Sequence, residues 1–271
     1  MPHPLTRIAA TLIAAAAIPF PAIAAGVDYS QQLDEQGLRS VHAFLEHKDC
    51  PGAVKALNKG VADKQRAVLL LAGSMFEQGI CVKQDWTRAA HFYQRAHEAG
   101  SKSAMPRLIS GYAEQNRDPA AALWWMAKTR ANLPQACTVA NHLADNPDAF
   151  VAALNAWPAG KIDACVYTGG VLQRLIGDIE FPGAGAVAGV SGDANLVFVP
   201  SAGTLTWTSG NVERIAVTRR VEHGETDSVV FKDAFLGHVR SIGARTLTQF
   251  KKPDGIDPAW TISMKFSFKY Q

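Results

Sequence analysis

The chain has 271 residues, of which 48% are hydrophobic and 19% are charged, and its formal net charge is +3 at pH 7. This composition excludes a disordered chain, because it supplies enough apolar side chains for a core. The small net charge argues against a surface dedicated to nucleic acid or to membrane lipid, so we expect no nucleic-acid partner.

The first 24 residues have the pattern of a secretory signal peptide. Arg7 is the only formal charge before Asp28, an apolar run covers residues 8–18, and an Ala-x-Ala cleavage site ends at Ala24. The apolar run is shorter than the roughly 20 residues that a helix needs to cross a bilayer, and two prolines follow it. We predict cleavage between Ala24 and Ala25, export to the periplasm and no stable membrane span afterwards; an uncleaved anchor is the alternative.

Two helices are predicted over residues 66–78 and 85–99. Asp85 can cap the second helix and Gly100 ends it. Small residues allow the two antiparallel helices to approach closely, while aromatic side chains fill the seams between neighbouring helix pairs. The side chains at helical spacing are Leu69, Ala72, Gly73, Phe76, Trp86, Ala89, Phe92, Tyr93 and Ala96.

This pattern recurs along the chain. One helix pair cannot bury its apolar face alone, so repeated pairs are expected to stack into an α-solenoid. A more degenerate fourth unit is predicted over residues 136–164. Equivalent residues are 36 positions apart in the first comparison (Asp49 with Asp85, Val68 with Ala104, Phe76 with Tyr112) and 32 apart in the next (Phe92 with Trp124, Tyr93 with Trp125, Ala104 with Ala136).

These positions resemble Sel1-like repeats, the short-period relatives of tetratricopeptide repeats, over residues 29–175 or so. Residues 68–104 match most of the family pattern, whereas the next unit has Ile109 and Asn132 where the pattern has glycine. The resemblance implies an α-helical repeat domain over residues 25–176 that binds other proteins, often as an adaptor. An irregular all-helical domain is the alternative.

The four cysteines are even in number, which in an exported chain suggests two disulfides, and no close pair has the spacing of a zinc site. In the register of the repeats, Cys50 and Cys81 both lie in helix-to-helix loops of adjacent units. Cys137 and Cys165 both follow an alanine at the start of successive first helices. Because stacking places equivalent points of adjacent units side by side, the repeat predicts Cys50–Cys81 and Cys137–Cys165 disulfides.

A linker is predicted over residues 177–194 and a small α+β domain with an antiparallel sheet over residues 195–271. A helix over residues 228–242 places Phe231, Phe235, Val239 and Ile242 on one stripe. Strands are predicted over residues 195–199, 204–207, 214–218 and 261–270, and the last is the clearest because apolar and polar residues alternate along it.

This order of elements resembles the C-terminal domain of TonB-like proteins over about 90 residues. The residues that carry the resemblance are the stripe from Phe235 to Val239, Phe250, Asp254 with Gly255, and the final strand. The resemblance implies contact with outer-membrane transporters. The anchor and Pro-rich spacer of an energy transducer are missing, and a generic small α+β domain is the alternative.

No catalytic constellation is predicted. Residues 183–188 formally fit a dinucleotide fingerprint but lie outside any βαβ unit. His91 and His97 are six positions apart and do not share a helix face, and His223 lies among acidic residues that mark a solvated loop. We therefore predict no catalytic residue, no metal site and no cofactor.

Trp124 and Trp125 are the candidate partner-binding residues. Adjacent helical residues point about 100° apart, so at most one of them faces the core squarely. Either one fills the repeat core and the other a seam, or one lines a groove and anchors a partner.

We expect a non-catalytic scaffold or adaptor that binds protein or peptide partners in the bacterial cell envelope. A peptidoglycan-modifying or other envelope hydrolase is the first alternative, and a TonB-like contact with outer-membrane transporters is the second.

Overall fold

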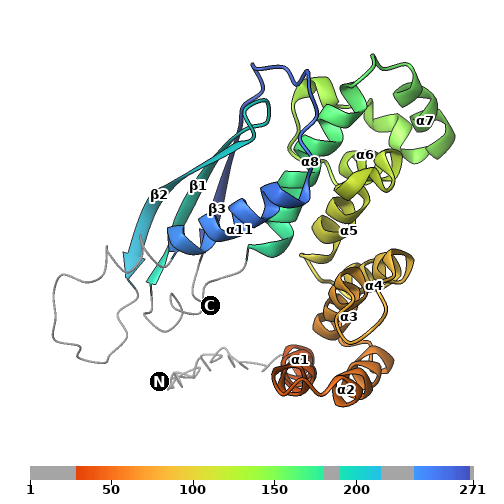
Figure 1. The fold of residues 1–271 in the computed structure, drawn as a ribbon, viewed down its shortest axis with the longest axis vertical. Coiled ribbons are helices and arrows are strands. Elements are labelled where there is room, and N and C mark those ends of the chain that lie inside the picture. Colours follow the sequence, from red (N-terminus) through yellow and green to blue (C-terminus); the bar gives the residue numbers. More distant parts are fainter. Residues whose placement is uncertain (1–28, 180–189, 215–234, 269–271) are drawn as a thin grey trace, which may run out of the picture.

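The protein is mostly helical, with a small three-stranded antiparallel sheet (Figure 1). The computed structural model describes residues 29–179, 190–214 and 235–268. The predicted cleavage site between Ala24 and Ala25 lies outside these residues. In the described part of the chain, no helix combines the length and the hydropathy that crossing a bilayer requires.

Within residues 29–179, eight α-helices precede the sheet. The first four pack at one end of the molecule, α5 to α7 continue the stack, and α8 runs beside α5 towards the sheet (Figure 1). They are α1 (Tyr29–Glu46), α2 (Cys50–Ala62), α3 (Arg66–Gln78), α4 (Trp86–Glu98), α5 (Ala104–Ala113), α6 (Pro119–Lys128), α7 (Pro147–Asn155) and α8 (Lys161–Asp178).

Aspartate caps start the second helix of three successive helix pairs. Each side chain accepts a hydrogen bond from the backbone N–H three residues later, which satisfies a group that the helix leaves without a partner. The same aspartate N-cap therefore recurs in each of these three helix pairs. The distances are 3.0 Å from Gly52 to Asp49, 3.0 Å from Arg88 to Asp85, and 2.9 Å from Ala121 to Asp118.

Two glycines allow aromatic rings to lie directly against helix backbones. A Cβ atom at Gly73 would collide with the ring of Tyr93, and one at Gly111 would collide with the ring of Trp86. The close approach of α3 to α4 that the small residues predict is therefore present, and it seats a fully buried Tyr93.

The fourth unit differs from its prediction. In place of a first helix, the chain forms two short 3-10 turns over Gln135–Cys137 and Asn141–Asp145. Cys137 thus lies in a turn and not in an α-helix. Pro134 removes a backbone donor before the first turn, and Pro147 stands at the start of α7, so prolines flank the segment that forms the two turns.

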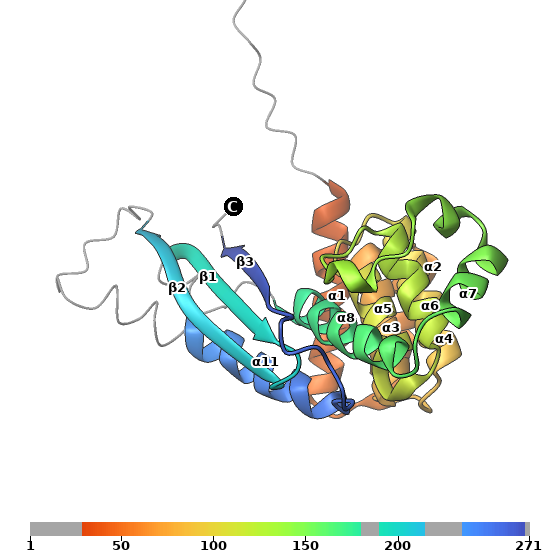
Figure 2. The same cartoon turned by 90° about the horizontal axis from the view of Figure 1, so that it is seen from above.

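The sheet consists of β1 (Val190–Val199), β2 (Thr204–Arg214) and β3 (Ile262–Phe268), with β1 in the centre and both pairings antiparallel. Helix α11 (Gly237–Gln249) covers one face of this sheet (Figure 2). Along β3, Ile262 and Phe268 are buried whereas the intervening Ser263 and Lys265 are exposed. The alternation that predicts the last strand is confirmed.

Several predicted boundaries in this region were wrong. Strand β1 begins inside the predicted linker. A single strand, β2, covers the predicted strand over residues 204–207 and continues to Arg214, where a separate strand was expected to begin. Helix α11 continues seven residues beyond Ile242; Gly243 lies against Leu205 and Trp207 of β2, and Thr246 is buried. Residues 183–188, 215–218 and 228–234, with Phe231, lie outside the described part.

One apolar core joins the helices to the sheet. It includes Cys165 and Leu172 on α8, Phe198 on β1, and Phe235 and Ile242 from the segment that covers the sheet. Helix α8 is buried along most of its length because α5 packs on one side and the sheet region on the other. This arrangement brings α11 within reach of α3 and α5.

Candidate functional site

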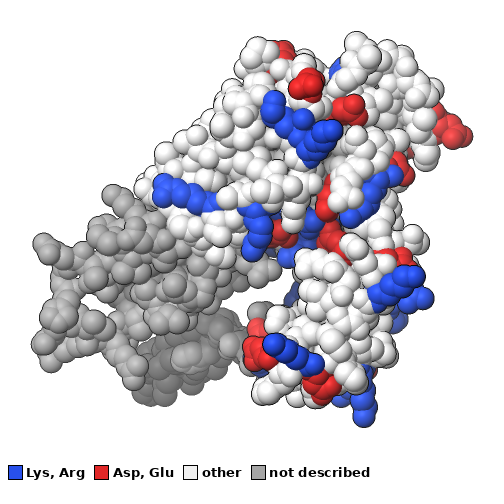
Figure 3. All heavy atoms as spheres, in the orientation of Figure 1, with Lys and Arg blue, Asp and Glu red and all other residues white. Residues whose placement is uncertain are grey.

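A polar pocket of about 740 Å³ opens where α3, α5, α8 and α11 approach one another. Figure 3 shows acidic and basic side chains gathered at this junction. We call it the charged pocket, and its lining residues are Glu77, Gln78, Gln84, Arg107, Glu114, Gln115, Arg117, Arg174, Asp178, Arg245 and Gln249.

Arg174 on α8 holds two carboxylates from distant parts of the chain. Its Nη2 atom lies 2.9 Å from Oε1 of Glu77 and 3.0 Å from Oε2 of Glu114. The Arg174 and Glu77 side chains are only 5% and 3% exposed. Burial by itself lowers the pKa of Arg174, but Glu77, Asp178 and Glu114 outweigh it and raise the pKa above its ordinary value. The guanidinium therefore stays charged in the wall of the pocket.

A second set of hydrogen bonds extends this network to α4 and α5. The Tyr93 hydroxyl donates to Oε2 of Glu77 at 2.6 Å and lies 3.3 Å from Oγ of Ser74. Arg107 donates to the same Ser74 oxygen at 2.7 Å and lies 3.4 Å from Asp178. Burial raises the pKa of Tyr93, and Glu77 raises it further. Tyr93 is therefore a neutral donor that connects α4 to the network.

The shortened loop between α5 and α6 positions Glu114. The 3-10 turn η1 (Glu114–Asn116) contains two consecutive residues with positive φ, Gln115 at 54° and Asn116 at 53°. Left-handed backbone at a residue other than glycine costs about 1–2 kcal/mol. Arg117 lies 3.4 Å from Glu114, and its guanidinium stacks 5.1 Å from the ring of Trp86. The sharp turn thus places the Glu114 carboxylate beside Arg174 and the Arg117 side chain at the rim of the charged pocket.

The network engages some side chains of the charged pocket and leaves others without partners among the described residues. Arg174 and Tyr93 engage both oxygens of Glu77, so Glu77 has no free oxygen to activate water. In contrast, the exposed Arg245 makes no ion pair within the described residues, and Oε1 of Gln249 is buried without a hydrogen bond there. These groups can donate to or accept from a bound molecule.

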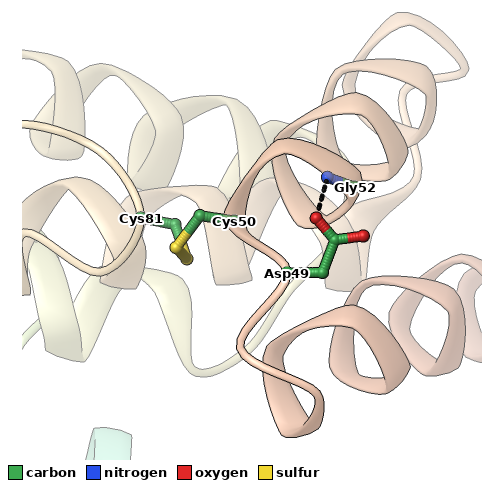
Figure 4. The surroundings of a disulfide bond; sticks show 4 residues. All are labelled: Asp49, Cys50, Gly52 and Cys81. Carbon is green, nitrogen blue, oxygen red and sulfur yellow. Dashed lines mark hydrogen bonds between the residues drawn. A yellow bond between two sulfur atoms is a disulfide. The ribbon is translucent and has the colours of Figure 1, made fainter.

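The disulfides join Cys50 to Cys81 and Cys137 to Cys165, the two pairs that the repeat register predicts. The S–S distances are 2.03 and 2.04 Å, and the Cα atoms lie 5.0 and 5.4 Å apart. Figure 4 shows Cys50 directly after the capping Asp49, with Cys81 in the loop of the neighbouring helix pair. Neither disulfide lines the charged pocket.

Trp124 and Trp125 lie away from the charged pocket. Both are half-buried against the core, and their ring centroids are 4.6 Å apart in an edge-to-face arrangement. The Trp124 Nε1–H donates to the Ala144 carbonyl at 2.9 Å, which ties α6 to a 3-10 turn. Trp125 contacts two neighbouring apolar clusters. These positions favour packing over partner anchoring.

No residue of the charged pocket was a candidate in the sequence. The sequence contains one indication that Arg174 has a special role, because this charged residue stands between the apolar residues Leu172 and Leu175, which are buried in the structure. His223 lies outside the described residues, and His91 lies beside Phe92, with ring centroids 6.0 Å apart. Residues 29–179, 190–214 and 235–268 contain no group of three metal-ligating side chains.

Comparisons of the chain with protein-family models, with curated proteins and with solved structures found no match. The function is therefore argued from the geometry of the chain itself.

Proposed function

We propose that this protein is an exported, non-catalytic scaffold that binds a protein or peptide partner in the bacterial cell envelope, through the charged pocket. We further propose that α1 to α6 form a solenoid of Sel1-like helix pairs. The recurring caps at Asp49, Asp85 and Asp118 support this, as do two disulfides, which are typical of exported chains.

The observation that carries the proposal is a preorganised pocket with unmatched hydrogen-bonding groups. The ion pairs of Arg174 and Arg107 hold α3, α5 and α8 together, so the walls need little reordering on binding. Gln78 and Arg245 lie exposed among the lining residues. A partner surface with peptide groups and a carboxylate would accept hydrogen bonds from these donors.

Site-specific cross-linking in cells tests this function. A photo-reactive residue at Gln78 or Arg245 should cross-link a discrete protein, whereas the same residue at Thr208, on the exposed face of the sheet, should not. The purified partner should then bind the purified mature protein, and Arg245→Glu should weaken this binding. A transporter as partner would favour the TonB-like hypothesis.

Two results would overturn the scaffold proposal. The first is an absence of any cross-link that depends on the charged pocket. The second is hydrolysis of peptidoglycan fragments by the purified protein, which would favour the envelope hydrolase instead.

A further inference from the structure

A second pocket, of about 500 Å³, lies between α4, α5, the end of α6 and α8. We call it the apolar pocket; its walls include Met105, Pro106, Ile109 and Ile176, and its volume falls in the range of ligand sites. Gln173 and Arg174 are consecutive on α8 and diverge by about 100°. Gln173 lines the apolar pocket, whereas Arg174 lines the charged pocket.

Two polar side chains line the apolar pocket without a hydrogen-bond partner among the described residues. Gln173 is 6% exposed and Ser101 is 8% exposed. In the described part of the chain, neither side chain makes a hydrogen bond, although both line the pocket. The polar atoms of both side chains are absent from the described buried atoms that lack a partner, so they face the water in the pocket. The pocket therefore presents an amide and a hydroxyl that a ligand can bond to.

The rim of this pocket is basic. His97, Lys102 and Arg130 line it, no acidic residue does, and none of the three has an ion-pair partner within the described residues. A carboxylate on the ligand would find complementary charge there.

The departures from the repeat pattern coincide with this pocket. Ile109 stands at the position equivalent to Gly73, and Asn132 at the position equivalent to Gly100, and both line the pocket. Gly73 is covered by the ring of Tyr93, whereas Ile109 supplies an apolar wall. The helix pair α5–α6 therefore differs from the preceding pair at two positions, Ile109 and Asn132, whose side chains line the apolar pocket.

We propose that the apolar pocket binds an extended apolar peptide segment that carries a carboxylate. Peptide groups present both a donor and an acceptor, which match the amide of Gln173 and the hydroxyl of Ser101. An alkyl chain would leave both unpaired. The proposal rests on the proposed function, since it assigns that scaffold a second peptide site on the other side of the α5–α8 contact.

Affinity selection from a peptide library tests this assignment. The library contains acetylated and amidated pentapeptides with a central Glu and Ala, Val, Leu or Ile elsewhere, and a second library has Gln at the centre. Immobilised mature protein should retain members of the Glu library preferentially. Gln173→Leu should weaken binding of the retained peptides by about tenfold without lowering the melting temperature, since it removes two hydrogen bonds at nearly constant volume.

A charge-matched comparison isolates the rim. Lys102→Ala with Arg130→Ala should abolish the preference for Glu over Gln, whereas Lys55→Ala with Lys59→Ala, on exposed positions of α2, should preserve it. Equal retention of both libraries by the wild type, or unchanged binding to Gln173→Leu, would overturn the inference. Decanoate that displaces the peptides and binds more tightly would assign the pocket to alkyl carboxylates and likewise overturn it. A partner cross-linked at the charged pocket, with no peptide retained here, would reject this inference alone.

Discussion

Arg174 and Glu77 are 97 positions apart in the chain, yet their side chains form a buried ion pair with an N–O distance of 2.9 Å. This pair joins α8 to α3, and Glu114 joins the same guanidinium from the turn after α5. Arg174 therefore links three segments that local sequence patterns cannot bring together.

Removal of Arg174 should destabilise the protein strongly. Arg174→Ala is expected to lower the free energy of unfolding by about 3–5 kcal/mol, because Glu77 would remain buried without its cation. Urea denaturation measures this loss. As a control, Arg39→Ala removes an exposed pair with Glu35 at 3.7 Å and should change the free energy by about 0.5 kcal/mol or less. Equal effects of the two substitutions would contradict the buried network.

Stability should fall at alkaline pH in a way that depends on Tyr93. Burial raises the pKa of Tyr93, so the folded state holds this proton more tightly than the unfolded state, where the pKa is about 10. Its contribution is fully present below about pH 10 and is lost as the pH rises through the folded pKa. Unfolding free energies measured from pH 8 upwards should show this decline.

Tyr93→Phe is the matched variant for the alkaline decline. It should cost about 1.5–3 kcal/mol at neutral pH through loss of the hydrogen bond to Glu77, and it should flatten the decline. A residual slope is expected, because burial also raises the pKa values of Tyr112 and Tyr167. An unchanged slope in Tyr93→Phe would be inconsistent with this assignment.

The two disulfides should differ in their resistance to reduction. Cys50 and Cys81 are partly exposed, whereas Cys137 and Cys165 are buried, so limited dithiothreitol should open the first bridge before the second. Alkylation and mass spectrometry can follow the order. Loss of either bridge, which spans 31 or 28 residues, should cost about 3.6 kcal/mol in the chain-entropy model. A Cys81–Cys137 peptide in non-reducing mapping would refute both pairings.

Trp124 should contribute mainly to stability. Trp124→Ala is expected to lower the free energy of unfolding by about 2–4 kcal/mol, since the ring packs on the core and its N–H bonds to Ala144. Trp124→Phe, which loses chiefly that hydrogen bond, should cost about 1 kcal/mol. Loss of partner binding at an unchanged melting temperature, in either tryptophan variant, would instead favour a role in a binding groove.

Features that depend on neighbouring residues could be predicted from the sequence. Asp85 caps α4 as expected, Gly100 follows that helix with φ at 91°, and the alternation along β3 matches one buried and one exposed face. Both predicted cysteine pairs are present, although Cys137 lies in a 3-10 turn and not in the helix that the predicted repeat register assigned to it.

Features that depend on how α8 and α11 pack could not be predicted. Helix α11 runs past the predicted end at Ile242 to Gln249 and buries Thr246, a burial that a polar residue does not reveal in sequence. The first helix of the fourth unit is replaced by turns between Pro134 and Pro147.

The sequence by itself thus determined the helix pairs, their caps, the last strand and a register for the disulfides, since each follows from local hydrogen bonding or from a periodic apolar face. Only the tertiary structure decided where the charges meet. Arg174 and Gln173 are neighbours in the chain, but the helix geometry turns one into the charged pocket and the other into the apolar pocket. The partners of Arg174 lie on α3 and in the turn after α5, and the packing of α8 against these segments brings them together.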